Sequence, residues 1–73
     1  MKENKVSVIL KEARKKQQLT HQKVVELSGA SITPQYYGAI ERGDRRPSPN
    51  VAKKIAPVLG LKWTIFFNEI ENQ

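Results

Sequence analysis

The sequence contains no cysteine, which excludes two common ways of holding a small protein together. Neither a disulfide framework nor a cysteine-ligated zinc site is available, and an intracellular, reducing location is compatible with this. The chain has 73 residues, near the lower limit at which one apolar core holds a fold without such supports. Stability must therefore come from packed secondary structure or from a partner subunit.

Long apolar runs are also missing from the sequence. No stretch approaches the roughly 18 to 20 apolar residues that span a membrane. The start, Met-Lys-Glu-Asn-Lys, is not followed by an apolar run long enough for a signal peptide. We therefore expect a cytoplasmic protein without a membrane partner.

The residue types of common active sites are scarce. The chain has one histidine, no glycine-rich phosphate loop, and neither an HExxH nor a GxSxG motif. A lone histidine without a cysteine or a second histidine is a poor metal ligand. We expect no enzymatic activity, no metal, no cofactor and no small-molecule ligand.

Acidic residues are few, and their distribution is uneven. Thirteen Lys and Arg residues against seven Asp and Glu give a net charge of +6. Up to Gly60 there are twelve basic and five acidic residues, whereas the last thirteen residues contain one lysine and two glutamates. A basic body suits a polyanion such as nucleic acid, and the apolar, slightly acidic end suggests a separate role. Charge alone leaves an ordinary basic surface equally open.

Proline and glycine divide the chain into five short stretches with helical patterns and no competing strand pattern. In the first stretch, Val6, Leu10 and Ala13 follow the i, i+4, i+7 spacing of one helix face. We expect an all-α fold in a single domain, residues 1–73. The expected helices cover residues 4–17, 20–28, 33–43, 49–59 and 63–71.

The second and third helices have visible starts and stops. Thr20 stands at an N-cap position and Gly29 at a stop, with Val24 and Leu27 expected to face the core. The third helix begins at Thr33 and Pro34 and ends at Gly43 in the same way. Two short helices joined by a tight, glycine-containing turn form a helix-turn-helix unit, here residues 20–43.

The fourth helix contains an unfavourable residue. Ser48 and Pro49 suit its start and Gly60 its end, but Pro57 lies inside it. An internal proline removes one backbone hydrogen bond and costs about 3 kcal/mol unless the helix bends or stops. We therefore expect a kink or an early end near residues 54–56.

From about Val6 to Phe67, the sequence resembles the helix-turn-helix domains of phage Cro proteins and repressors, the XRE family. The matching segments are Leu19-Thr20, Leu27-Ser28-Gly29, Ile40-Glu41-Arg42-Gly43, Arg46-Pro47-Ser48, and Leu59-Gly60-Leu61 leading to Phe66-Phe67. The resemblance implies a compact five-helix, lambda-repressor-like bundle. It also implies a sequence-specific transcriptional regulator, with repression the favoured mode, that binds double-stranded operator DNA as a homodimer in a bacterial or phage-infected cell.

The resemblance places base-reading positions near the start of the third helix. They fall on Pro34, Gln35, Tyr36, Gly38 and Ala39. Gln35 is the strongest candidate, because an amide can both donate to and accept from adenine, a contact worth roughly 1 to 3 kcal/mol of discrimination. Without the resemblance, a solvated helix residue is the simpler interpretation of Gln35.

Phosphate-binding positions follow from the same resemblance. They are Thr20, His21, Lys23, Thr33, Arg45 and Arg46. An exposed, uninvolved side chain is the alternative for His21.

The family also pairs Arg14 with Glu41, as a structural ion pair between the first and third helices. The segment between Gly29 and Ile40 is about two residues longer than usual in the family, which predicts a wider turn or an additional helical turn.

The most apolar stretch lies near the C-terminus. It contains Trp63, Ile65, Phe66, Phe67 and Ile70. The simplest interpretation is a helix that closes the core, and an apolar excess would suit a dimer interface. The alternative function is therefore a protein-interaction module of the same fold, such as an antitoxin that binds a toxin through this helix.

Overall fold

The computed structural model describes residues 5–67, which contain four helices and a short helical stretch, residues 65–67. The four are α1 (Lys5–Lys16), α2 (His21–Ser28), α3 (Pro34–Arg42) and α4 (Pro49–Leu59). Residues 65–67 are helical and end the described part of the chain. No strand occurs in residues 5–67, so the prediction of an all-α fold is confirmed. The remainder of the predicted fifth helix, including Ile70, lies outside the described residues.

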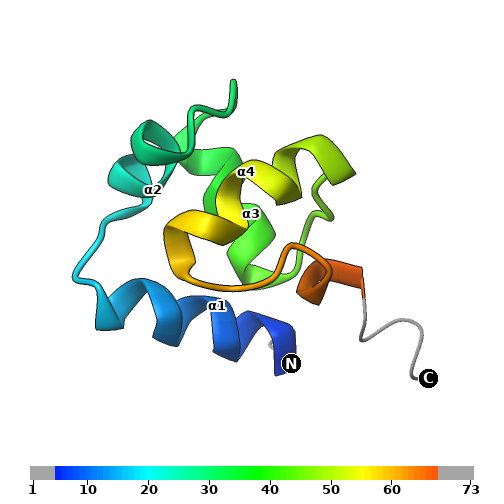
Figure 1. Ribbon diagram of the computed structural model, residues 1–73, viewed down its shortest axis with the longest axis horizontal. Coiled ribbons are helices and arrows are strands. Elements are labelled where there is room, and N and C mark those ends of the chain that lie inside the picture. The colour runs from blue at the N-terminus through cyan, green and yellow to red at the C-terminus, as the bar shows by residue number, and fades with distance from the viewer. Residues whose placement is uncertain (1–4, 68–73) are drawn as a thin grey trace.

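The helices enclose one core. Both α1 and α2 pack against α3 and α4, and α1 runs along the lower side of the view in Figure 1. All four helices supply buried apolar side chains, because each carries an apolar stripe at helical spacing. The buried residues of the core are Leu10, Val24, Tyr37, Ile40, Ala52, Ile55, Ala56, Leu59 and Phe66.

The predicted helix starts are confirmed by their hydrogen bonds. The Thr20 hydroxyl accepts from the Lys23 amide at 3.1 Å, and the Thr33 hydroxyl accepts from the Tyr36 amide at 3.0 Å. Ser48 caps α4 in the same way. Gly43 ends α3 with a φ of 89°, a left-handed conformation that is strained for residues with a Cβ atom. The limits of α2, α3 and α4 are therefore set by single residues.

The turn between α2 and α3 spans residues 29–33 and contains no helical turn. Its extra length is therefore taken up by a wider connection, one of the two predicted alternatives. The Ser28 hydroxyl donates to the Val25 carbonyl and accepts from the Ala30 amide. Ala30 is buried, so the turn is held against the core where it leaves α2.

Leu27 is 56% exposed, and the prediction that it faces the core is wrong. The inner face of α2 is formed by the buried Val24 and by the half-buried His21, Val25 and Ser28. With about 3.6 residues per turn, Leu27 lies roughly 110° from the centre of that face. In a helix of two turns, the two apolar residues Val24 and Leu27 did not define the direction of the buried face.

Of the two outcomes predicted near residues 54–56, the early end of α4 is wrong, because the helix continues to Leu59. The lost hydrogen bond is the one from residue 57 to the Lys53 carbonyl. Both residues are exposed, so water can solvate that carbonyl. The buried Ile55, Ala56 and Leu59 keep the last turn packed on the core.

Candidate nucleic-acid interface

One stripe of α3 faces away from the core. Its inner side is formed by four buried residues, Tyr37, Gly38, Ile40 and Glu41. On the outer side, Gln35 and Arg42 are exposed and Ala39 is half-buried. These three positions follow the i, i+4, i+7 spacing of a single helix face. We call Gln35, Ala39 and Arg42 the outer stripe.

Gly38 is not part of this stripe, and its predicted place near a base stays a prediction. It is buried at the contact between α3 and α2. A Cβ atom at this position would lie 3.3 Å from Nδ1 and 3.4 Å from Cε1 of His21. The close approach of the His21 ring is therefore a reason within the fold for glycine at this position.

The remaining predicted base-reading residues lie at the start of α3. Gln35 is exposed in the first turn, while Pro34 and Tyr36 are half-buried. Gln35 is therefore the exposed side chain of this group that carries both a donor and an acceptor.

A buried carboxylate lies behind the outer stripe and holds the first three helices together. Glu41 is 3% exposed. Arg14 of α1 donates from Nε to Oε2 at 2.7 Å and from Nη2 to Oε1 at 3.2 Å. The third arginine nitrogen, Nη1, donates to the Leu19 carbonyl at 2.8 Å. The guanidinium therefore connects α1, the α1–α2 turn and the end of α3.

Two further side chains complete the coordination of Glu41. Tyr37 donates its hydroxyl to Oε2 at 3.2 Å, and His21 of α2 lies with Nε2 3.1 Å from Oε1. The His21 and Tyr37 rings also meet edge to face, with centroids 5.5 Å apart. We call Arg14, His21, Tyr37 and Glu41 the carboxylate cluster. It fixes α2 relative to α3.

The electrostatics of the cluster keep Glu41 ionised. Burial alone would raise the pKa of Glu41, but hydrogen bonds and positive charge from Arg14 and His21 lower it below its ordinary value. Burial, together with the nearby Glu41 charge, strongly raises the pKa of Tyr37, so its hydroxyl stays protonated and donates. The hydrogen bond to Glu41 raises the pKa of Arg14.

The phosphate contact of His21 stays a prediction, and the structure gives the ring a partner within the fold. An ionised carboxylate only accepts, so Nε2 of His21 must carry the proton that Glu41 receives. In the protonated ring, Nδ1 is also a donor and can reach a phosphate, whereas in the neutral ring it is an acceptor. In both states His21 joins α2 to Glu41.

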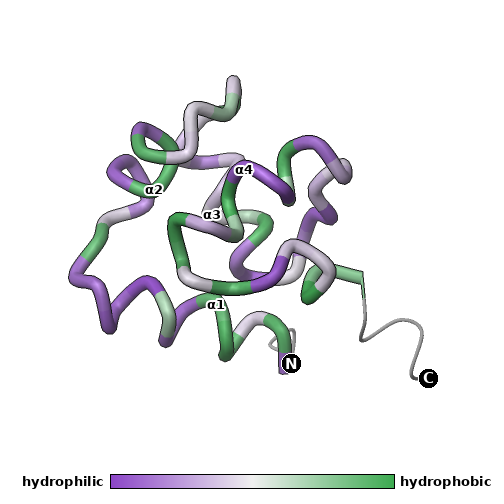
Figure 2. Tube along the Cα trace, in the orientation of Figure 1, coloured by the Kyte–Doolittle hydropathy of each residue, from purple (hydrophilic) through white to green (hydrophobic). Residues whose placement is uncertain are grey.

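Exposed polar and basic residues lie at the starts of α2 and α3 and in the turn after α3. They are Thr20, Lys23, Thr33, Arg45 and Arg46. The two threonine oxygens accept from backbone amides in the caps of α2 and α3, and each hydroxyl proton remains available for a phosphate oxygen. Figure 2 shows the turn after α3, which contains Arg45 and Arg46, as a hydrophilic stretch of the chain.

Arg42 is a candidate that the sequence analysis missed. It is exposed at the end of the outer stripe, and its Nε lies 3.1 Å from Oδ2 of Asp44. Both terminal guanidinium nitrogens remain for a ligand. Arg42 follows Gln35 by seven residues, a spacing that places both on one helix face, and this could have identified it from the sequence.

The C-terminal apolar residues are divided between core and surface. Phe66 is buried in the core, while Trp63, Ile65 and Phe67 are partly buried against it. The Trp63 and Phe67 rings meet edge to face with centroids 5.8 Å apart. This stretch therefore closes the core, as the simplest interpretation expected. Within residues 5–67, no helix has the length and apolar character needed to cross a membrane.

The capped pair α2 and α3, crossing at Gly38 with an outward stripe on α3, defines a helix-turn-helix domain. The family model described as Helix-turn-helix matches residues 10–66, and the chain belongs to this family. The predicted resemblance to the XRE type is thereby confirmed.

A curated relative supports the same assignment. The chain is 42% identical over 64 residues to an uncharacterized HTH-type transcriptional regulator, YqaF, of Bacillus subtilis (strain 168). The aligned region covers 88% of this chain and 82% of the relative. No solved structure matches the chain significantly.

Proposed function

We propose that this protein is a transcriptional regulator that binds an operator in double-stranded DNA, with α3 in the major groove. Membership of the Helix-turn-helix family and the similarity to a transcriptional regulator support this class of function. The observation that carries the proposal is the outer stripe on α3, flanked by exposed Thr20, Lys23, Thr33, Arg45 and Arg46.

Gln35 supplies the direct contact to a base. It lies in the first exposed turn of α3, where helix-turn-helix proteins contact base edges. Its amide matches the N6 donor and N7 acceptor of adenine. Pro34 and Ala39 can add apolar contact to a thymine methyl group, and Tyr36 can donate from its hydroxyl.

The basic and hydroxyl groups around α3 position the domain on the DNA backbone. Thr20 and Thr33 lie at the N-termini of α2 and α3, where free amides and the helix dipole favour an anion. Lys23 lies in the first turn of α2, and Arg45 and Arg46 follow α3. We add Arg42, whose side chain lies at the opposite end of the outer stripe from Gln35.

A homodimer on an inverted repeat is the proposed assembly. Such dimers contact half-sites about one helical turn apart, and occupancy of such a site blocks polymerase at an overlapping promoter. The proposal places the protein in the cytoplasm of a bacterial or phage-infected cell, where its DNA target is found. It involves no cofactor and no enzymatic step.

The test is selection from random duplexes with the purified full chain. We expect enrichment of an inverted repeat whose half-sites are centred about 10 base pairs apart. A footprint should then cover both half-sites. Recovery of duplexes without a common sequence would overturn the proposal.

A further inference from the structure

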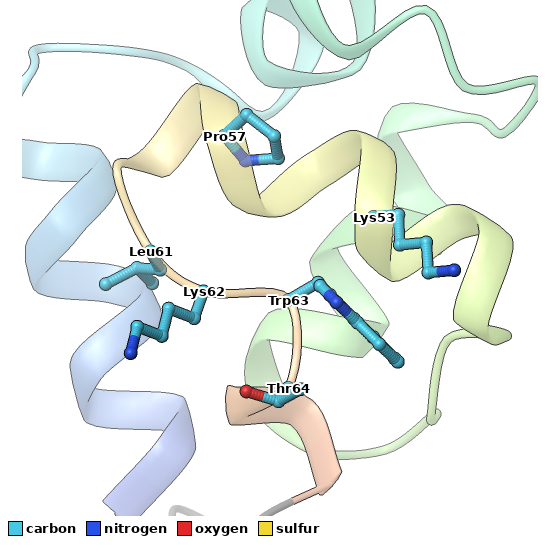
Figure 3. A pocket seen from close by; sticks show the side chains of 6 residues that line it. All are labelled: Lys53, Pro57, Leu61, Lys62, Trp63 and Thr64. Carbon is cyan, nitrogen blue, oxygen red and sulfur yellow. The ribbon is translucent and has the colours of Figure 1, made fainter.

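A groove lies on the side of the molecule where the chain passes from α4 to its C-terminal segment (Figure 3). Its volume is about 330 Å³, near the lower end of the range of about 300 to 1,000 Å³ for ligand pockets. It is lined by Lys53, Pro57, Leu61, Lys62, Trp63 and Thr64. None of these residues belongs to the proposed DNA-binding surface.

The lining defines the chemistry that fits the groove. Trp63, Pro57 and Leu61 offer apolar surface, and the Lys53 amine lies 4.9 Å from the centroid of the Trp63 ring. In Figure 3, the side chains of Lys53 and Lys62 extend in opposite directions at the two edges of the groove. Neither lysine forms an ion pair with a carboxylate in residues 5–67. A segment with an apolar residue between two acidic ones is complementary to this arrangement.

The chain itself contains such a segment beyond the described residues. Glu69-Ile70-Glu71 holds both acidic residues of the sequence after Asp44, with an isoleucine between them. We propose that the groove binds Glu69-Ile70-Glu71 of a second copy of the chain, so that each copy fills the groove of the other. The inference rests on the homodimer of the proposed function and names its contacts.

Two-fold symmetry fits this pairing. In a symmetric dimer, if residue i contacts residue j of the partner, residue j also contacts residue i. We pair Lys62 with Glu71 of the partner, and Trp63 with Ile70 of the partner. The midpoint of each pair along the sequence lies between Phe66 and Phe67. One two-fold axis at that point therefore brings both pairs together in an antiparallel crossing. It also places the partly exposed Phe67, next to the axis, beside its copy.

The alternative occupant is the same segment of the same chain. That arrangement needs a reversal of the chain between Phe67 and Glu69, with only Asn68 between them. A second copy needs no reversal. The buried Phe66 holds residues 60–66 against the core. The groove therefore keeps its shape when Glu69-Ile70-Glu71 is not bound.

Charge exchange in the full chain tests the proposal, with no DNA present. The variants are Lys62→Glu, Glu71→Lys and the two combined, and Lys54→Glu is the control. Lys54 is exposed on α4 and does not line the groove. Sedimentation velocity over a concentration series gives the dimer dissociation constant. The emission of Trp63, the only tryptophan, reports directly on the groove over the same series.

Each single change should raise the dimer dissociation constant by about tenfold or more, because the lost pair occurs twice and becomes a repulsion. The combined variant should return to within about threefold of the wild type, since opposite charges again face each other. Lys54→Glu should leave the constant unchanged. The Trp63 emission should shift as the wild type dimerises.

Three results would overturn the inference. The first is a wild-type chain that stays monomeric at the highest concentration. The second is a dimer whose dissociation constant the single changes leave unchanged. The third is the same unchanged constant with an altered unfolding temperature of the variants, which would indicate that the segment binds within its own chain. The proposed function has a separate readout, since a monomer still binds one half-site weakly. A chain that dimerises normally but binds no half-site DNA would contradict the proposed function and leave the dimer contacts standing.

Discussion

At the scale of single residues, base recognition by this domain rests on few groups. Gln35 is exposed at the start of α3, whereas Gly38 is buried and Pro34 and Ala39 lack side-chain hydrogen-bonding groups. Direct hydrogen bonds can therefore specify few base pairs. DNA shape and the spacing of phosphate contacts must supply the rest of the specificity.

The roles of Gln35 and Arg45 are separable by mutation. Gln35→Ala should relax the preference at one base pair, at a cost of roughly 1 to 3 kcal/mol on the preferred operator, because the amide contact is lost. Arg45→Ala should weaken binding to all sequences alike, since a phosphate contact carries no sequence information. Titrations of the operator and its single-base variants distinguish the two. Uniform weakening by both changes would remove Gln35 from the base-reading role.

Glu41 makes the stability of the fold dependent on acid. The pKa of Glu41 is lowered in the folded chain, so its contribution is present above its ordinary value of 4.5 and is lost as the pH falls through the folded pKa. Glu41→Gln should destabilise the chain at neutral pH by on the order of 3 kcal/mol, since it leaves the Arg14 charge without its partner.

Urea unfolding from neutral pH to about pH 3 measures this contribution. The wild type should lose stability below about pH 4.5, and the Glu41→Gln variant should lose much less over the same range. Glu26→Gln is the control, because Glu26 is exposed and pairs with Lys23 at the surface. Equal acid sensitivity of the wild type and Glu41→Gln would mean that Glu41 is not the group responsible.

At the scale of elements, the crossing of α2 and α3 depends on Gly38 and His21 together. A Cβ atom at position 38 would press on a ring that is held by Glu41 and Tyr37. Gly38→Ala should therefore destabilise the wild type, although alanine by itself favours a helix interior by roughly 0.5 to 1 kcal/mol over glycine.

The same change should have the opposite sign once the ring is removed. In a His21→Ala background, Gly38→Ala should stabilise the fold by roughly 0.5 to 1 kcal/mol, since the helix propensity then acts alone. A double-mutant cycle from unfolding curves measures the coupling. Additive effects would show that the ring and the glycine do not constrain each other.

The limits of the elements could be predicted from the sequence because each depends on local chemistry. Thr20, Thr33 and Ser48 each cap the helix that follows them, and Gly43 ends α3. The orientation of Leu27 and the continuation of α4 to Leu59 depend on neighbouring elements. Local patterns wrongly placed Leu27 in the core and allowed an early end of α4. The contact of His21 with Glu41 and Gly38 joins residues 17 to 20 positions apart, and no spacing rule connects them.

At the scale of the whole molecule, the outer stripe and the exposed Lys23, Arg45 and Arg46 share no residue with the groove beside Trp63. The proposed DNA contacts and the proposed dimer contacts therefore involve separate residues. Each domain should bind its half-site through α3, and the dimer should set the spacing between half-sites. Weakened dimerisation should lower affinity for the full operator more than for a single half-site.

The most direct test of the central claim is a titration of the purified chain against its selected operator and a scrambled duplex of equal length, over a series of salt concentrations. The operator should bind at least about a thousandfold more tightly than the scrambled duplex. The logarithm of both binding constants should fall linearly with the logarithm of salt concentration, because phosphate contacts release counterions. Equal affinity for the two duplexes, or binding that salt does not weaken, would contradict the account.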